Sequence, residues 1–151
     1  MTSAMVRRPL GTFVGARSGD KGGNANVGVW VIDPVEAAAV RLAQGAPASL
    51  DVEPAAVVLA DERFAWLSSV ITVGGIRDLL PECADLEVEV HALANLRAIN
   101  VVIHGLLGRG VAESSRVDPQ AKGLGEHLRA RIVDIPAHLL GPLQPEDGED
   151  L

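Results

Sequence analysis

The chain has 151 residues, of which 48% are apolar and 22% are charged. A chain of this length and apolar content can form one compact domain that buries roughly two-thirds of the surface exposed by its unfolded state. The composition excludes a disordered chain, a collagen-like chain and a small protein held together by disulfides.

The net charge of −7 is unevenly distributed. Four acidic residues lie among the last six, whereas the first 23 residues carry four basic side chains and one acidic one, a local charge of +3. Nucleic-acid binding needs a cationic surface and aromatic stacking platforms. This acidic chain has only four aromatic residues and no Tyr, so we expect no nucleic-acid partner.

The cysteine count and the hydropathy pattern bear on the compartment. Cys83 has no second cysteine to pair with, which is typical of proteins from a reducing compartment. No run of 18 uncharged apolar residues occurs, and no apolar segment follows the basic residues near the start of the chain. We therefore expect a cytoplasmic protein without a membrane-spanning segment.

The first part of the chain predicts a hairpin followed by a helix. After a flexible N-terminal segment, residues 1–9, we expect strands at 10–16 and 26–32, with Val27, Val29 and Val31 on one face. Asp33 and Pro34 form a typical helix start, and that helix continues to Ala43 and ends at Gly45.

The middle of the chain is less regular. Residues 45–60 contain two prolines and are predicted to be a connection or insertion. A helix is expected from Asp61 through Leu67, and Thr72 can cap a second one that Pro81 closes. Residues 85–93 alternate between apolar and polar side chains, which predicts a strand with one face in water.

The last third predicts another helix, strand and tail. Leu96, Ile99 and Ile103 follow helical spacing, so we expect a helix that Asn95 opens and a run of glycines at 105–110 ends. A further helix is predicted from Asp118 to about His127, then a strand to Ile135. Residues 10–140 would form a single α+β domain, a mostly antiparallel sheet with helices on one face, and 141–151 a disordered acidic tail.

The usual motifs of cofactor and metal chemistry are absent from the sequence. We find no phosphate-binding P-loop, no dinucleotide fingerprint and no zinc-protease or serine-hydrolase motif. The four histidines are scattered without metal-ligand spacing. We therefore predict neither a metal site nor a cofactor.

The segment from Arg17 to Asn26 is the clearest candidate for a binding site. Its glycines permit close backbone approach and its two cations supply charge, so its amides could surround a phosphate or carboxylate. Alternatively, Gly22 and Gly23 form the turn of an ordinary hairpin. A third alternative places oxygen ligands from three of its side chains around a hard cation. The candidate ligand-binding residues here are Arg17, Ser18, Asp20, Lys21, Gly22, Asn24 and Asn26.

Three further residues complete the candidate set. The chain has eleven Arg but only two Lys, and Lys122 stands beside glycine as Lys21 does. Asn95 is interpreted mainly as a helix cap. Asn100 falls on the apolar face of the expected helix, where its amide needs either a structural hydrogen bond or a ligand.

These residues also carry a resemblance to a known family. The segments Ala16–Gly22 with Ala25–Val29, Asn95–Val102 with the glycines that follow, and Asp118 with Ala121–Gly125 resemble the C-terminal domain of the acyclic terpene utilisation protein AtuA family. The resemblance spans about residues 10–136. It implies a ferredoxin-like α+β sandwich and a role in bacterial catabolism of acyclic terpenoids or branched acyl-CoA compounds.

Full-length members of that family carry a much larger N-terminal domain, so here that domain would be a separate chain or dispensable. Three functional hypotheses follow. The chain is an accessory subunit of a large AtuA-type chain, a domain that by itself binds or transforms an anionic ligand such as a CoA thioester, or a structural homo-oligomer without a ligand.

Overall fold

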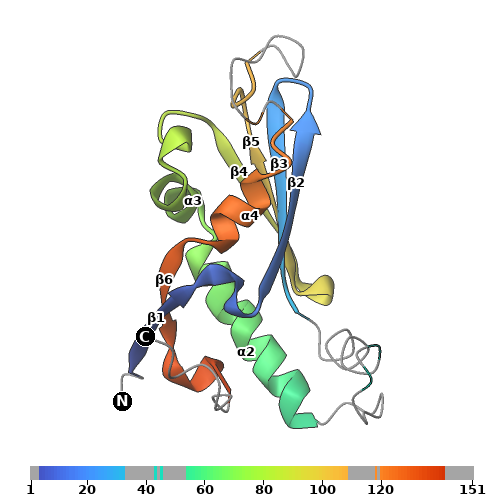
Figure 1. Ribbon diagram of the computed structural model, residues 1–151, viewed down its shortest axis with the longest axis vertical. Helices are drawn as coiled ribbons and strands as arrows, with labels where there is room; N and C mark the ends of the chain where they lie inside the picture. The colour runs from blue at the N-terminus through green and yellow to red at the C-terminus, as the bar shows by residue number, and fades with distance from the viewer. Residues whose placement is uncertain are drawn as a thin grey trace.

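A computed structural model describes residues 4–32, 43, 45, 54–108, 118 and 120–141. The described part contains six strands, three α-helices and four short 3₁₀ segments, η1 to η4, arranged as shown in Figure 1. The strands and α-helices in chain order are β1 (Met5–Pro9), β2 (Val14–Lys21), β3 (Asn24–Val31), α2 (Pro54–Val70), α3 (Val73–Leu79), β4 (Val88–Leu93), β5 (Ala98–Ile103), α4 (Leu124–Arg129) and β6 (Ile132–Pro136). The 3₁₀ segments are η1 (Leu10–Thr12), η2 (Pro81–Cys83), η3 (Ala94–Leu96) and η4 (Ala137–Leu139).

The strands form two antiparallel sheets. The larger has the order β2-β3-β5-β4, and the smaller is a ribbon of β1 with β6. Strands β2 and β3 are joined by a two-residue turn at Gly22 and Gly23, where Gly22 has a φ of +65°. The hairpin interpretation of this segment is therefore confirmed. The loop expected at 17–25 is too long, because strands β2 and β3 continue to Lys21 and from Asn24 on either side of the turn.

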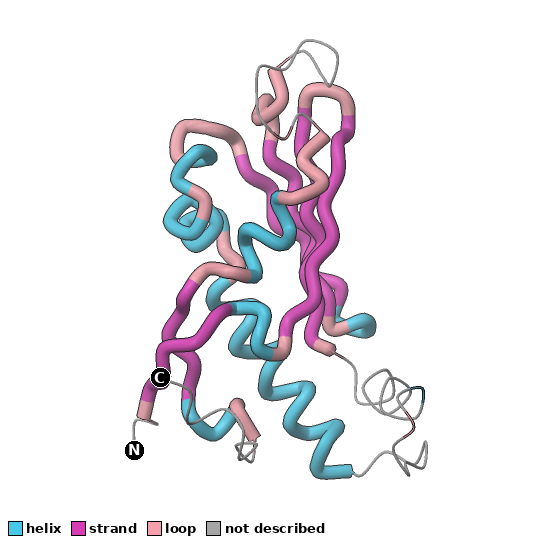
Figure 2. The backbone as a smooth tube through the Cα atoms, in the orientation of Figure 1, coloured by secondary structure: helices cyan, strands magenta, loops and turns pink. Residues whose placement is uncertain are grey.

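Three helices lie against one face of the larger sheet, as Figures 1 and 2 show. Alternate residues of the two central strands are buried on that face, including Val27 and Val29 of β3 and Ile99 and Val101 of β5. Leu67 of α2 and Leu128 of α4 are fully buried in the same core. The expected α+β class, with an antiparallel sheet covered by helices on one face, is confirmed.

The predicted helix after Asn95 is wrong, because this stretch forms η3 and then strand β5. Leu96, the first residue of the supposed apolar stripe, is 63% exposed, whereas Ile99, Val101 and Ile103 are buried in strict alternation. Apolar residues at 99 and 103 fit both periodicities. The β-branched side chains between them favour the strand, and pairing with β3 and β4 on both sides decides it.

Several element boundaries also differ from expectation. Residues 5–9, expected to be flexible, pair with β6 along their whole length. Helix α2 begins at Pro54, so the last part of the predicted 45–60 connection is helical. Helix α4 begins only at Leu124 and includes Leu128, although the sequence predicts that Leu128 starts the last strand. Strands β2 and β4 begin a few residues later than predicted.

The cap at Thr72 is confirmed, because its side chain accepts a hydrogen bond of 3.0 Å from the amide of Gly75. Residues 33–42 of the helix expected at 33–43, most of the 45–53 connection and the acidic tail after residue 141 lie outside the described residues. Within the part of the chain that the structure describes, no helix is long and apolar enough to cross a bilayer.

Candidate functional site

Two glycine-containing segments that are about a hundred residues apart in the sequence meet at Ser18. The hydroxyl of Ser18 on β2 donates a hydrogen bond to the carbonyl oxygen of Ala121, and the carbonyl oxygen of Lys122 lies 3.2 Å away. The same hydroxyl accepts a bond of 2.8 Å from the amide of Gly125. Ser18 therefore fastens the start of α4 to the edge strand of the sheet.

The close approach of α4 to β2 leaves little room for a side chain at Gly125. A Cβ there would lie 3.3 Å from both the Cβ of Ala16 and the backbone nitrogen of Arg17. The segment before α4 is held by Asp118, whose carboxylate accepts bonds of 3.1 and 3.0 Å from the amides of Lys122 and Gly123. These bonds fix the backbone that carries the Lys122 side chain.

The junction is bordered by an open depression of about 370 Å³. The lining residues come from β2 and from the 121–126 segment: Ala16, Arg17, Ser18, Lys122, Gly125 and Glu126. Two of them, Arg17 and Lys122, are exposed cations, and the one carboxylate, Glu126, is paired with Arg129 at 3.0 Å. The depression can therefore present positive charge to an anion in a chain that is acidic overall.

Most of the other predicted residues lie elsewhere, on the face of the larger sheet opposite to the helices. The register places Gly28, Asn100 and His91 in one row with Arg17, which lies on the edge strand β2 and so borders both this face and the depression. Asn26 lies in the next row, opposite Gly19. Asn100 thus lies on the sheet face that none of the described helices covers, here called the open face. The predicted helix had instead placed it among the apolar core residues.

The side chains of Asn26 and Asn100 are half-buried, and the structure gives them no hydrogen bond to a described residue. A structural hydrogen bond to a neighbouring strand, one of the two alternatives for Asn100, is therefore not found in the described part of the chain. Asn95 lies in η3 at the other end of the sheet from the Gly22 turn, exposed and without a helix to cap.

The polar residues beside the Gly22 turn do not gather at one point. The side-chain oxygen of Asn24 accepts a bond of 2.9 Å from the amide of Gly105, which ties the hairpin to the turn after β5. Asp20 pairs with Ala25, so it shares the helix-covered face, while Asn24 and Asn26 share the opposite one. These three side chains do not converge on one cation. No group of three or more His, Cys, Asp or Glu in the described residues could hold a metal.

Two arrangements were missed from the sequence. On the open face, Glu89 lies 2.6 Å from the Nε2 of His104 and 3.9 Å from that of His91. The alternation of residues 85–93 predicts that Glu89 and His91 share one face of a strand. His104 could have been added to this group only if residues 98–103 had been recognised as the neighbouring strand.

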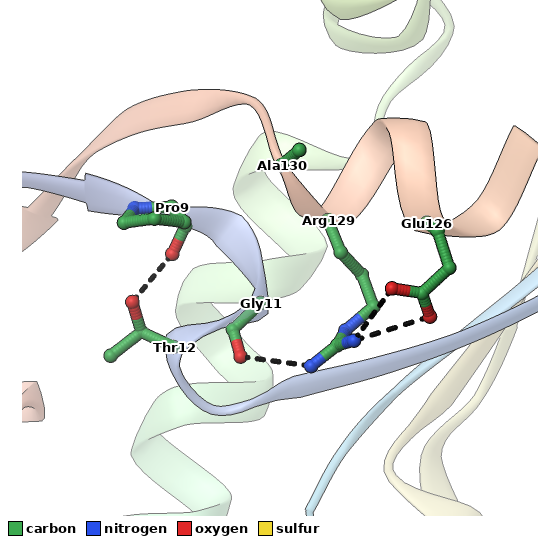
Figure 3. A pocket seen from close by; sticks show the side chains of 6 residues that line it. All are labelled: Pro9, Gly11, Thr12, Glu126, Arg129 and Ala130. Atoms are coloured by element: carbon green, nitrogen blue, oxygen red, sulfur yellow. Dashed lines mark hydrogen bonds and ion pairs between the residues drawn. The ribbon is translucent and has the colours of Figure 1, made fainter.

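The second arrangement centres on Arg129, seen in Figure 3 beside Gly11, Thr12 and Glu126. Its guanidinium donates to the carbonyl oxygens of Val14 at 2.8 Å and Gly11 at 3.3 Å, and it also pairs with Glu126. Arg129 thus satisfies backbone groups where β2 begins, a role that no local sequence signal indicates.

The antiparallel sheet with helices on one face is that of a ferredoxin-like α+β domain. A model of the AtuA ferredoxin-like domain family matches residues 8–134, and the chain belongs to that family. No curated protein and no solved structure matched the sequence.

Proposed function

We propose that this chain is an accessory binding domain that acts with a larger AtuA-type chain in bacterial catabolism of acyclic terpenoids or branched acyl-CoA compounds, in the cytoplasm. Its contribution is a cationic contact for the anionic group of the substrate. The observation that supports this proposal is the open depression at the junction of the two glycine segments, which has both Arg17 and Lys122 among its lining residues.

The two cations suit a phosphate or carboxylate in complementary ways. A guanidinium offers a planar pair of donors to two oxygens, while an ammonium is a compact charge that adapts to the third. Glu126, the one acidic residue of the lining, is partly compensated by Arg129. Because the depression is open, the remainder of a large ligand such as a CoA thioester can extend toward a partner chain.

Isothermal titration of the purified chain with CoA tests this contact. An exposed ion pair contributes up to about 1 kcal/mol, so Lys122→Ala and Arg17→Ala should each weaken binding by about fivefold, and the affinity should fall as salt is added. Arg7→Ala is the matched control, since Arg7 is exposed on β1, and its removal changes the net charge equally. Equal affinities for all three variants would exclude the depression as the anion site.

Co-expression with a large AtuA-type chain from the same organism tests the accessory role. We expect the two chains to co-purify, and we expect Lys122→Ala to lower CoA affinity in the complex as it does in the isolated domain. Failure to co-purify would reject the accessory role while leaving the anion contact to be judged by titration.

A further inference from the structure

The open face of the larger sheet has an ordered pattern of charge and size. Reading across β2, β3, β5 and β4, the register gives the row Gly19, Asn26, Val102, Glu89 and the row Arg17, Gly28, Asn100, His91. Toward the Gly22 turn the next row is Lys21, Asn24, His104, Glu87, since the amide of His104 bonds the carbonyl oxygen of Glu87. At the other end stand Gly15, Trp30, Ala98 and Leu93.

The positive and negative side chains of this face lie at opposite edges of the sheet. The cations Arg17 and Lys21 both stand on β2, while the carboxylates Glu87 and Glu89 stand at or next to β4 on the opposite edge. Arg17, Lys21 and Glu87 are exposed. A surface with opposite charges at its two edges is complementary to its own image turned by 180° about an axis along the strands.

We infer that the open face binds a second copy of this chain, sheet against sheet, about a two-fold axis that runs along the strands between β3 and β5. Such an axis places β2 of each copy over β4 of the other and keeps each row opposite the same row. Lys21 then faces Glu87 of the second copy, and Arg17 faces His91 with Glu89 one row away. Every contact occurs twice.

The sizes of the facing residues agree with this arrangement. Gly28 comes opposite Asn100, and above Gly28 there is open space, because a Cβ at this position would have the backbone oxygen of Arg17, at 3.8 Å, as its nearest neighbour. Gly19, which is equally open, comes opposite Glu89. The half-buried side chain of Asn100, which has no hydrogen bond to a described residue, would fill the space above Gly28 of the second copy.

The end of the face near η3 supplies apolar contact. The indole of Trp30 folds over Gly15, where a Cβ would lie only 2.4 Å from the ring. Leu93 is 43% exposed and would pack on that indole from the second copy. Stacked sheets lie about 10 Å apart, a distance that side chains of these sizes span.

The four rows give each copy sixteen residues, fewer than the roughly 20–30 a side of a standard interface. We therefore expect a dimer that dissociates on dilution. Sedimentation equilibrium of the full chain over a range of concentrations should show a mass rising from 15.8 kDa toward twice that value. A monomer at all concentrations would overturn the inference and leave the face to another partner.

Charge reversal tests which surface is used. Lys21→Glu and Glu87→Lys should each weaken the dimer by at least tenfold, because each brings two pairs of like charges together. The double variant Lys21→Glu with Glu87→Lys restores both pairs and should recover most of the affinity. A dimer indifferent to all three variants would use a different surface and would overturn the inference.

A steric variant gives independent evidence. Gly28→Leu fits within one copy but occupies the space that Asn100 of the second copy needs, so it should leave a folded monomer. Gly74→Leu is the matched control, because Gly74 is exposed in α3 and equally free of neighbours. Persistence of the wild-type dimer in Gly28→Leu would exclude this packing. Arg17 belongs to both surfaces, whereas Lys122 belongs to the depression alone, so the Lys122→Ala titration and this test can fail separately.

Discussion

The hydroxyl of Ser18 accepts a hydrogen bond of 2.8 Å from the amide of Gly125, and this bond joins the edge strand β2 to the start of α4. The residue before that helix, Gly123, has no capping side chain of its own. Ser18 therefore supplies from a neighbouring strand the acceptor that a helix start normally takes from its own cap residue. The two glycine segments of the sequence form one structural unit.

Ser18→Ala should lower the stability of the domain. The substitution leaves the buried amide of Gly125 without its acceptor and removes one of the two donors to the carbonyl oxygen of Ala121, the other being the amide of Leu124. An unsatisfied buried polar group costs about 1–3 kcal/mol, which corresponds to a fall in Tm of about 3–10 °C for a chain of this size. Thermal unfolding followed by circular dichroism measures the difference.

Ser69→Ala is the control for this prediction. Ser69 also donates from its hydroxyl to a backbone oxygen, that of Trp66 in its own helix, but it is exposed. Its replacement should change the free energy of unfolding by less than about 0.5 kcal/mol. Equal effects at the two positions would mean that Ser18 is not the link between β2 and α4.

The sequence was sufficient for the hairpin and for the sheet's covered face. Gly22 and Gly23 have the composition of a two-residue turn, and the alternating Val27, Val29 and Val31 leave one possible buried face. It was not sufficient for β5, where Ile99 and Ile103 satisfy helical and strand spacing alike. Pairing with β3 and β4 decides between them, and such long-range pairing cannot be detected in a single stretch of sequence.

The candidate site, like the fold, could be predicted from the sequence only in part. Arg17, Ser18 and Lys122 were selected from composition and motif, and the structure brings them to one depression. Asn100 was selected because an amide on an apolar helix face needs a partner, yet it lies on an open sheet face. The amide side chain correctly indicated a residue in need of a partner, but the predicted secondary structure around it was wrong. An error in periodicity changes which side chains share a face, so Asn100 was expected among the wrong neighbours.

Two adjacent glycines in α3 should respond in opposite ways to alanine. Gly74 has open space where a Cβ would be, so Gly74→Ala should stabilise the domain by about 0.5 kcal/mol through helix propensity. At Gly75 a Cβ would lie 1.9 Å from the backbone oxygen of Val70. Gly75→Ala should therefore cost about 1–3 kcal/mol, because backbone must move. Urea unfolding compares the two, and a shared sign would contradict the packing of α3 against the end of α2.

Arg63 should not be replaceable by lysine. Its Nε donates a bond of 2.7 Å to the carbonyl oxygen of Leu139, and its guanidinium lies 4.5 Å from the ring centre of Phe13. Lysine cannot make both contacts at once, so Arg63→Lys should cost about 1–2 kcal/mol. Urea unfolding measures this loss, and Arg7→Lys, at an exposed position on β1, should be neutral.

Burial lowers the pKa of Arg63 below its usual value, because desolvation penalises the charged guanidinium. A base with a lowered pKa in the folded state costs stability while it is charged, and that cost is relieved only as the pH rises through the lowered value. Since a guanidinium stays protonated near neutrality, the loss caused by Arg63→Lys should be constant between about pH 6 and 8. A loss that varies across this range would show that other groups titrate with it.

Asp118 positions the backbone of Lys122. Removing its side chain distinguishes the effect of this positioning on anion binding from the effect of its negative charge. Asp118→Ala deletes the acceptor of the Lys122 and Gly123 amides. Hydrogen exchange at these two amides should therefore accelerate by about tenfold. The amide of Gly125, which is bound to Ser18, should stay protected. The same change removes one negative charge, which by itself would strengthen anion binding. If the fixed backbone is what presents the Lys122 side chain, CoA affinity should fall despite the more favourable charge. A rise in affinity would show that only the net charge around the depression matters.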